Sequence, residues 1–175
     1  ERAAQLMQRT SQFNLTGHKQ SVAERLESDH ELKLIGSAKD KCGDYGQVGL
    51  VLGHIVPGTL VIDGLWLSCR ALGRGVEFEI LKRIALVATD QQQNKVLLRI
   101  VATDRNTPAQ KFIDFLALRL GGKLHSPEAR TREVELTASA LSGLNPLDST
   151  AVSITPGDNF TSTRESMGKA TRSSE

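Results

Sequence analysis

The spacing of apolar residues changes halfway along this chain, and this change restricts the possible folds more than any other feature. Residues 31–38, 48–56 and 59–69 form three strand-like apolar runs that are separated by short turns. Three such runs in succession are typical of an antiparallel meander. At residues 75–88 the apolar residues instead recur at helical spacing, and an apolar strand follows at 95–101.

Helix and strand continue to alternate in the second half of the chain. Thr107 is the expected N-cap of a helix that Gly121 ends. Residues 131–137 alternate in polarity and predict the last strand, while two helices are expected before the meander, at 2–12 and 21–29. This order predicts an α/β (α+β) fold in which helices flank a central, mostly antiparallel sheet.

The composition changes near the C-terminal end. Residues 143–175 are rich in Ser and Thr and poor in large apolar side chains, so they bury too little surface to offset the entropy of ordering. We therefore predict a folded domain over 1–142 and a flexible linker over 143–175, within which Val152, Ile154 and Phe160 could still dock locally.

Charge and apolar content argue against several classes of partner. The formal charge is only +2 and the 22 basic residues are spread along the chain, which argues against a nucleic-acid-binding face. No apolar run approaches the roughly 20 residues needed to cross a bilayer. Because the sequence begins at Glu1 in a helical pattern, without a signal peptide, we expect a cytoplasmic piece of a longer polypeptide.

The cysteines and histidines do not indicate a metal site. The four histidines lie far apart, and neither Cys42 nor Cys69 belongs to a Cys-x-x-Cys pair. The two cysteines could pair, but the chain lacks other features of a secreted disulfide scaffold, so two free thiols are expected.

Residues 68–77 (SCRALGRGVE) join the third strand to the next helix and have features of an anion-binding loop. Unpaired N–H groups at a helix N-terminus attract negative charge. Gly73 and Gly75 allow a phosphate to approach the backbone, and Arg70 and Arg74 add positive charge. The alternative is a turn with two glycines and two solvated arginines.

The order of the elements, together with Arg-x-x-Gly-x-Gly at the start of a helix, resembles the GNAT superfamily of N-acyltransferases over about residues 1–140. The resemblance implies that this loop binds the pyrophosphate of acyl-CoA through Arg70, Gly73 and Gly75. Amine-acetylating members often carry Phe-Tyr in the following helix, with Tyr as the general acid. This chain has Phe112-Ile113 there, and Tyr45 is its only tyrosine. The departure argues against ordinary acetyl transfer to amines.

Three segments together resemble the C-terminal half of FkbH-type proteins: 8–16 (QRTSQFNLT), 43–49 (GDYGQVG) and 68–77. The usual pattern has Asn where this chain has Ser11. The resemblance implies a domain that loads a glyceryl group from bisphosphoglycerate onto the phosphopantetheine arm of an acyl carrier protein in polyketide biosynthesis. It also implies an upstream HAD-type phosphatase domain that binds magnesium. That half is missing here, so this chain alone is not expected to remove phosphate.

The FkbH-type resemblance, with the charges around the thiol, implies that Cys69 is a nucleophile that holds the glyceryl group as a thioester. Arg70, Arg74 and the following helix N-terminus all favour a thiolate. The phosphopantetheine arm, or that of CoA, would lie along Arg70 to Val76. These candidate cofactor-binding residues are Arg70, Leu72, Gly73, Arg74, Gly75 and Val76. The alternative is a small buried core cysteine.

The other two motifs supply polar candidates. Asn14 and Asp44 are predicted catalytic helpers, and Gln12 and Asn14 are predicted to bind the substrate. The alternative is that Asn14 and Asp44 cap turns, as these residue types commonly do. Trp66 is expected in the core.

Three functions follow from these patterns. The first is the glyceryl-loading role, with an acyl carrier protein and the upstream HAD-type domain as partners. The second is a GNAT acyltransferase that uses acyl-CoA. The third is a catalytically silent module that only docks a carrier protein.

Overall fold

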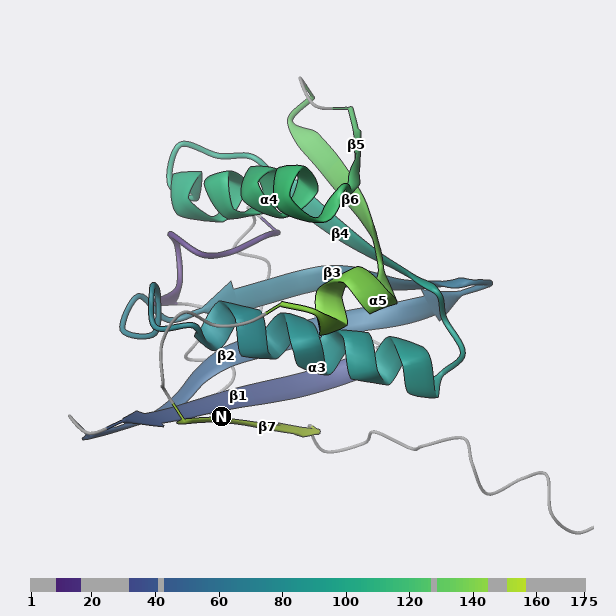
Figure 1. Ribbon diagram of the computed structural model, residues 1–175. Helices are drawn as coiled ribbons and strands as arrows, with labels where there is room; N and C mark the ends of the chain where they lie inside the picture. The colour runs from purple at the N-terminus through teal and green to yellow at the C-terminus, as the bar shows by residue number, and fades with distance from the viewer. Residues whose placement is uncertain (1–8, 17–31, 41–42, 127–128, 145–150, 157–175) are drawn as a thin grey trace, which may run out of the picture.

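The meander predicted from the apolar runs forms one half of the sheet. The computed structural model describes residues 9–16, 32–40, 43–126, 129–144 and 151–156. Its first three strands are β1 (Leu32–Asp40), β2 (Gly43–Val56) and β3 (Thr59–Leu67). Each pairs antiparallel with the next, and Pro57 and Gly58 form the turn between β2 and β3 (Figure 1).

The other half of the sheet begins with a parallel crossover. Helix α3 (Val76–Asp90) returns the chain to β4 (Lys95–Val101), which pairs parallel with β3. Parallel neighbours need such a long connection, usually a helix. The remaining strands are β5 (Lys123–His125), β6 (Thr131–Thr137) and β7 (Ala151–Pro156). The described sheet has seven strands in the order β5-β6-β4-β3-β2-β1-β7, and only the β3–β4 pairing is parallel. The mostly antiparallel sheet is therefore confirmed.

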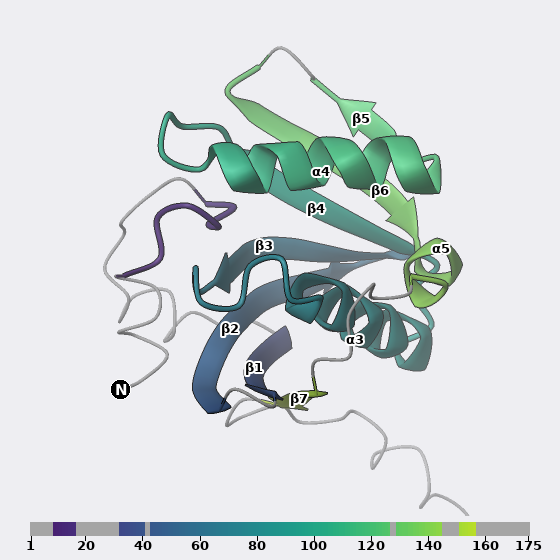
Figure 2. The same cartoon turned by 60° about the vertical axis from the view of Figure 1, so that its left-hand side comes forward.

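Two long helices cover the same face of this sheet. Figures 1 and 2 show α3 in front of β1–β3, and α4 (Thr107–Leu120) in front of β4 and β6. Short helix α5 (Ala138–Ser142) packs against α3. The core lies between helices and sheet, where Val76, Ile80 and Ile84 of α3 are at most 1% exposed.

Several local predictions were wrong in detail. The N-cap of α4 is Asn106 rather than Thr107. Strand β2 begins at Gly43 instead of Val48, because the Gly43–Gly46 segment pairs with the end of β1 through irregular register. In the predicted helix 2–12, Arg9 is helical but residues 10–12 are not. The predicted helix 21–29 lies outside the described residues.

The predicted linker contributes a strand. Residues 151–156 form β7, which pairs antiparallel with β1 from Leu34 to Lys39. The local docking that Val152 and Ile154 allowed thus takes the form of strand pairing. Phe160 lies outside the described residues, and the domain boundary at residue 142 stays a prediction.

Strands β3 and β4 separate after four paired residues, and the segment 13–15 lies between them. Their pairing ends at Ile62 and Leu98. Beyond that point Leu15 donates its N–H to Leu65 O (3.1 Å), Leu67 donates to Phe13 O (3.0 Å), and Val101 donates to Leu15 O (2.8 Å). Phe13 and Leu15 are at most 2% exposed. The segment is therefore part of the core and closes the gap in the sheet.

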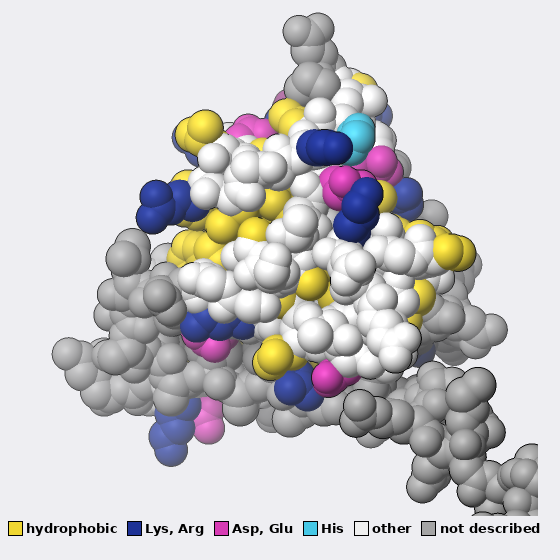
Figure 3. Space-filling model, turned by 45° about the vertical axis from the view of Figure 1, so that its right-hand side comes forward, with side chains coloured by type: hydrophobic (Ala, Val, Ile, Leu, Met, Phe, Trp, Pro, Cys, Tyr) yellow, Lys and Arg dark blue, Asp and Glu magenta, His cyan; other side chains and the backbone are white. Residues whose placement is uncertain are grey.

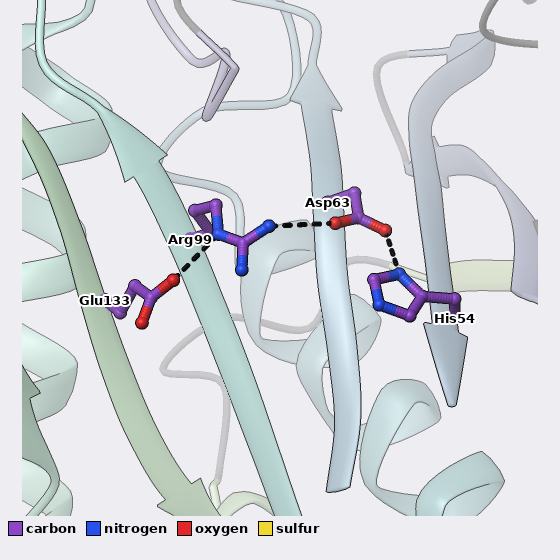
Figure 4. A network of polar contacts seen from close by, with 4 residues as sticks. All are labelled: His54, Asp63, Arg99 and Glu133. Atoms are coloured by element: carbon purple, nitrogen blue, oxygen red, sulfur yellow. Dashed lines mark hydrogen bonds and ion pairs between the residues drawn. The ribbon is translucent and has the colours of Figure 1, made fainter. Parts of the chain in front are cut away.

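A charged network crosses the sheet where the two strands separate. Asp63 and Arg99 directly follow the last paired residues, and Arg99 Nη1 lies 3.4 Å from Asp63 Oδ1. Figure 4 shows the network continuing to His54 on β2 and to Glu133 on β6. It links four neighbouring strands through partly exposed side chains.

The predicted core position of Trp66 is confirmed, and it depends on a glycine. Trp66 is 1% exposed and its indole ring covers Gly64, where a Cβ would overlap the ring. We expect Gly64→Ala to lower the free energy of unfolding by about 1–3 kcal/mol, because a rigid buried ring must move. Urea denaturation measures this. Gly143→Ala, at a position where a Cβ meets only ordinary contacts at 3.6 Å, is the control. Equal stability of the two variants would contradict the explanation.

Candidate functional site

The three segments that carry the sequence resemblance meet around one cavity. Its volume is about 810 Å³. The lining residues are Arg9, Thr10, Ser11, Gln12, Phe13, Asp44, Tyr45, Gly46, Gln47, Leu67, Ser68, Cys69 and Arg70. The first five come from the segment beside the sheet gap and the next four from the start of β2. The last four are the final residue of β3 and the three residues that follow it. Polar groups from distant parts of the sequence thus share one site.

Cys69 presents a free, exposed thiol in the wall of this cavity. It lies in the turn that begins directly after β3. Ser68 donates its N–H to Val48 O (2.7 Å), and Ala71 donates to Ser68 O (2.9 Å), so backbone bonds fix both sides of the cysteine. The exposure excludes the alternative of a small buried core cysteine. Cys42 lies outside the described residues.

The glycine loop after Cys69 lies mostly outside the cavity. Gly73 and Gly75 have φ values of 72° and 81°, in the left-handed region that side chains disfavour. Arg70 lines the cavity with Cys69. The other predicted cofactor-binding residues, Leu72, Gly73, Arg74, Gly75 and Val76, do not. Val76 is fully buried and Leu72 packs against the core.

Of the three predicted polar site residues, two line the cavity and one does not. Gln12 and Asp44 line the cavity, while Asn14 does not. Asn14 is 7% exposed, and its Oδ1 accepts hydrogen bonds from Thr16 N and Thr16 Oγ1, both at 2.8 Å. Asp44 Oδ1 accepts from Gly46 N at 2.7 Å. Both residues therefore make the turn contacts of the alternative interpretation.

Arg9 and Tyr45 are among the cavity residues that sequence reasoning did not single out. Arg74 places its guanidinium carbon 4.8 Å from the centre of the Tyr45 ring, so a cation–π contact joins the glycine loop to the start of β2. Both missed residues lie inside the quoted motifs, which was the available signal.

The remaining chemistry of the described residues is limited. They contain no group of three or more potential metal ligands. Within the same ranges, no helix is both long and apolar enough to cross a membrane.

Comparison with known proteins decides the fold. No protein-family model matches the sequence, and no curated protein matches it. Among solved structures, the ribosomal-protein-S18-alanine N-acetyltransferase from Escherichia coli is similar with a TM-score of 0.50 and 10% identity, over 78% of this chain and 85% of that chain. The chain has the GNAT fold.

Two further structures are similar at lower scores. The IAA acetyltransferase from Bacillus cereus is 12% identical with a TM-score of 0.41, over 53% of this chain and 71% of that chain. A spermidine N-acetyltransferase variant from Vibrio cholerae is 10% identical with a TM-score of 0.44, over 69% of this chain and 73% of that chain.

The GNAT fold places Ile113 in the core rather than at a site. Ile113, where amine-acetylating members often carry the acidic tyrosine, is 0% exposed and lies in the face of α4 that packs on the sheet. No proton donor is available at that position. The phenol of Tyr45 lies in the cavity wall instead.

The carboxyl group of Glu77 accepts a backbone hydrogen bond from Gly73 in the glycine loop. Glu77 lies in the first turn of α3 and is 8% exposed. Burial raises the pKa of its carboxyl group above the usual value, although hydrogen bonds from the backbone N–H groups of Glu77 and Gly73 act in the opposite direction. Its Oε2 has no hydrogen-bond partner among the described residues. The folded protein therefore favours the neutral form of this carboxyl group more than the unfolded chain does.

This burial gives a testable pH dependence. Because the folded-state pKa of Glu77 is raised, its contribution to stability is fully present below the unfolded-state pKa and is lost as the pH rises through the folded-state value. Glu77→Gln keeps a carbonyl to accept the Gly73 N–H but does not titrate. The variant should therefore gain stability relative to the wild type as the pH rises from 4 to 7 in urea denaturation. Parallel stability curves would contradict this assignment.

Proposed function

We propose that this chain transfers an acyl group between thiols: it holds a glyceryl thioester on Cys69 and passes it to the phosphopantetheine thiol of an acyl carrier protein. One observation supports this above all. The three separate segments that resemble FkbH-type proteins surround one cavity, and a free, exposed thiol lies in its wall. The partners in the proposal are the carrier protein and an upstream HAD-type domain.

The proposed chemistry is two acyl transfers, of which the second is a thioester exchange. The Cys69 thiolate attacks the carbonyl carbon of the acyl phosphate in the bisphosphoglycerate donor, the carbon–oxygen bond breaks, and phosphate leaves. The thiolate of the carrier then attacks the new Cys69 thioester and releases Cys69. In each step one bond to the acyl carbon forms and one breaks, so no oxidant or reductant is needed. The protein has to position the partners and stabilise the oxyanion.

Four of the cavity residues and two neighbouring features receive roles in this proposal. Arg9 and Arg70 supply positive charge in the cavity that also holds the thiol. Gln12 and Asp44 face the glyceryl hydroxyl groups. Asn14 becomes a positioning residue that fixes the segment carrying Gln12, because its side chain is occupied by Thr16. The loop from Leu72 to Val76 receives the phosphate of the arm at the N-terminus of α3.

Acyl trapping tests the proposal directly. The purified chain is incubated with the glyceryl thioester of N-acetylcysteamine, a small activated donor that replaces bisphosphoglycerate and the upstream domain. Intact-mass analysis should show one added glyceryl group, and peptide mapping should place it on Cys69. Added holo carrier protein should remove the group and acquire it. An adduct elsewhere, or none, would mean that Cys69 does not carry the acyl group.

Tyr45 supports a second candidate function. An acyl-CoA-dependent N-acyltransferase needs a general acid for the leaving thiolate, and the Tyr45 phenol lies in the same cavity as Cys69. Under this alternative the chain should acylate an amine from acyl-CoA without a covalent intermediate, and Tyr45→Phe should slow the reaction on the order of a hundredfold. In the thiol-transfer proposal, Tyr45→Phe leaves formation of the Cys69 adduct intact.

A further inference from the structure

An aromatic patch lies on the helical face of the fold, outside the cavity. It consists of Phe78 in α3 and of Phe112, Phe115 and Leu118 in α4. Phe115 is 44% exposed and Leu118 is 88% exposed. The Phe78 ring lies 5.7 Å from Phe112 and 6.3 Å from Phe115, so the patch spans both helices. Figure 3 shows hydrophobic side chains gathered between the two helices.

One buried ring, that of Phe13, separates the patch from the cavity, and it is 2% exposed. Phe13 lines the cavity, and its ring centre lies 5.3 Å from that of Phe112. Phe112 stacks in turn with Phe115 at 6.5 Å. Phe78 lies in the first turn of α3, directly after the glycine loop that ends at Gly75. A partner whose arm enters the cavity would therefore have its body close to this patch.

The edge of the patch is positively charged. Lys111 lies one turn before Phe115, and Arg119 follows Leu118; both are exposed. None of the ion pairs among the described residues involves either of them, whereas Asp114 of the same helix pairs with Arg132 at 2.9 Å. Aromatic side chains beside uncompensated cations are the composition of an interface for an acidic partner.

We infer that Phe78, Phe112, Phe115 and Leu118, with Lys111 and Arg119 at the edge, form the docking surface for the folded body of an acidic acyl carrier protein. This inference rests on the proposed function, because the cavity on the other side of the Phe13 ring is the proposed end point of the carrier arm. The contact would be short-lived, as a carrier that visits several enzymes requires, so a small interface suffices.

The double variant Phe115→Ser/Leu118→Ser tests the surface. Both side chains are exposed, so the fold should survive the change. Two acceptors are compared after Cys69 is acylated: the holo acyl carrier protein of a glyceryl-loading polyketide pathway, and free pantetheine, which has the arm without the protein. We expect about a tenfold rise in KM for the carrier and no change for pantetheine. Val56→Ser is the matched control, because Val56 is 38% exposed in the hairpin at the opposite end of β3.

Two outcomes would overturn the inference: an unchanged KM for the carrier, or equal losses with carrier and pantetheine, since the patch would then hold the arm. Direct binding of the apo carrier separates this failure from failure of the proposed function, because binding needs no chemistry. Binding that weakens in the double variant while Cys69 takes no acyl group supports the surface and removes the transfer mechanism. A wild-type chain that binds no carrier overturns the surface.

Discussion

Replacing Cys69 with alanine should reduce glyceryl transfer to the carrier protein on the order of a thousandfold or more, because the variant has no nucleophile to form the thioester. The fold should be unaffected: Cys69 is exposed, and substitutions at such positions change the free energy of unfolding by about 0.5 kcal/mol or less. Single-turnover loading of the carrier, followed by intact mass, measures the loss. Urea denaturation confirms that the variant is folded.

Two further variants sharpen this test. Cys42→Ala removes the other cysteine and should leave loading intact. Cys69→Ser should accumulate a glyceryl ester that the carrier thiol removes slowly, because an oxygen ester is a poorer acyl donor than a thioester. Undiminished loading by Cys69→Ala would identify the chain as a docking module, the third function considered.

The second large effect is expected at Asn106, which is 1% exposed and joins three parts of the fold. Its Nδ2 donates to Asn14 O at 2.8 Å and to Val101 O at 2.9 Å, and its Oδ1 accepts from Thr103 N at 2.8 Å. Asn106→Ala should lower the free energy of unfolding by about 2–4 kcal/mol, because these buried backbone groups lose their partners. Loading by the folded fraction should also fall, since segment 9–16 carries one wall of the cavity.

Matched variants test this explanation. Asn106→Asp keeps the acceptor for Thr103 but faces two carbonyl oxygens with a carboxylate, so it should be at least as destabilising as alanine. Asn94→Ala, at an exposed position, should stay within about 0.5 kcal/mol of the wild type. A stable Asn106→Asp variant would show that the two Nδ2 hydrogen bonds do not hold the segment.

The main elements could be predicted because their signals are local. Strands β4 and β6 have the predicted bounds, since each is a periodic run with clear ends. Strands β5 and β7 could not be predicted: the first has three residues, and the second lies in a Ser- and Thr-rich stretch that becomes a strand only because β1 offers it an edge. The placement of segment 13–15 between β3 and β4 was also invisible, because it depends on contacts with residues far away in the sequence.

The site was predictable to the extent that motifs mark it. Cys69, Arg70, Gln12 and Asp44 do share a cavity, and this followed from three short motifs. A motif does not show whether a polar side chain contacts the substrate or a turn of its own backbone. Asn14 was therefore predicted to be a catalytic residue, although its side chain accepts hydrogen bonds from Thr16. Tyr45 was not considered as a proton donor because the family's tyrosine was sought at Ile113 in α4. The fold instead places Tyr45, at the start of β2, in the same cavity as Cys69.

The insertion of residues 13–15 into the sheet has a consequence for biosynthesis. Asn14 and Asn106 are 92 residues apart, so the N-terminal segment leaves the ribosome well before its partners exist. At about 5–20 residues per second, it waits roughly 5–20 seconds in an unfinished chain. Such non-local contacts also slow folding, because loop closure precedes any gain from pairing. The cavity wall is therefore completed late, and the thiol gains its binding site only once most of the domain has been synthesised.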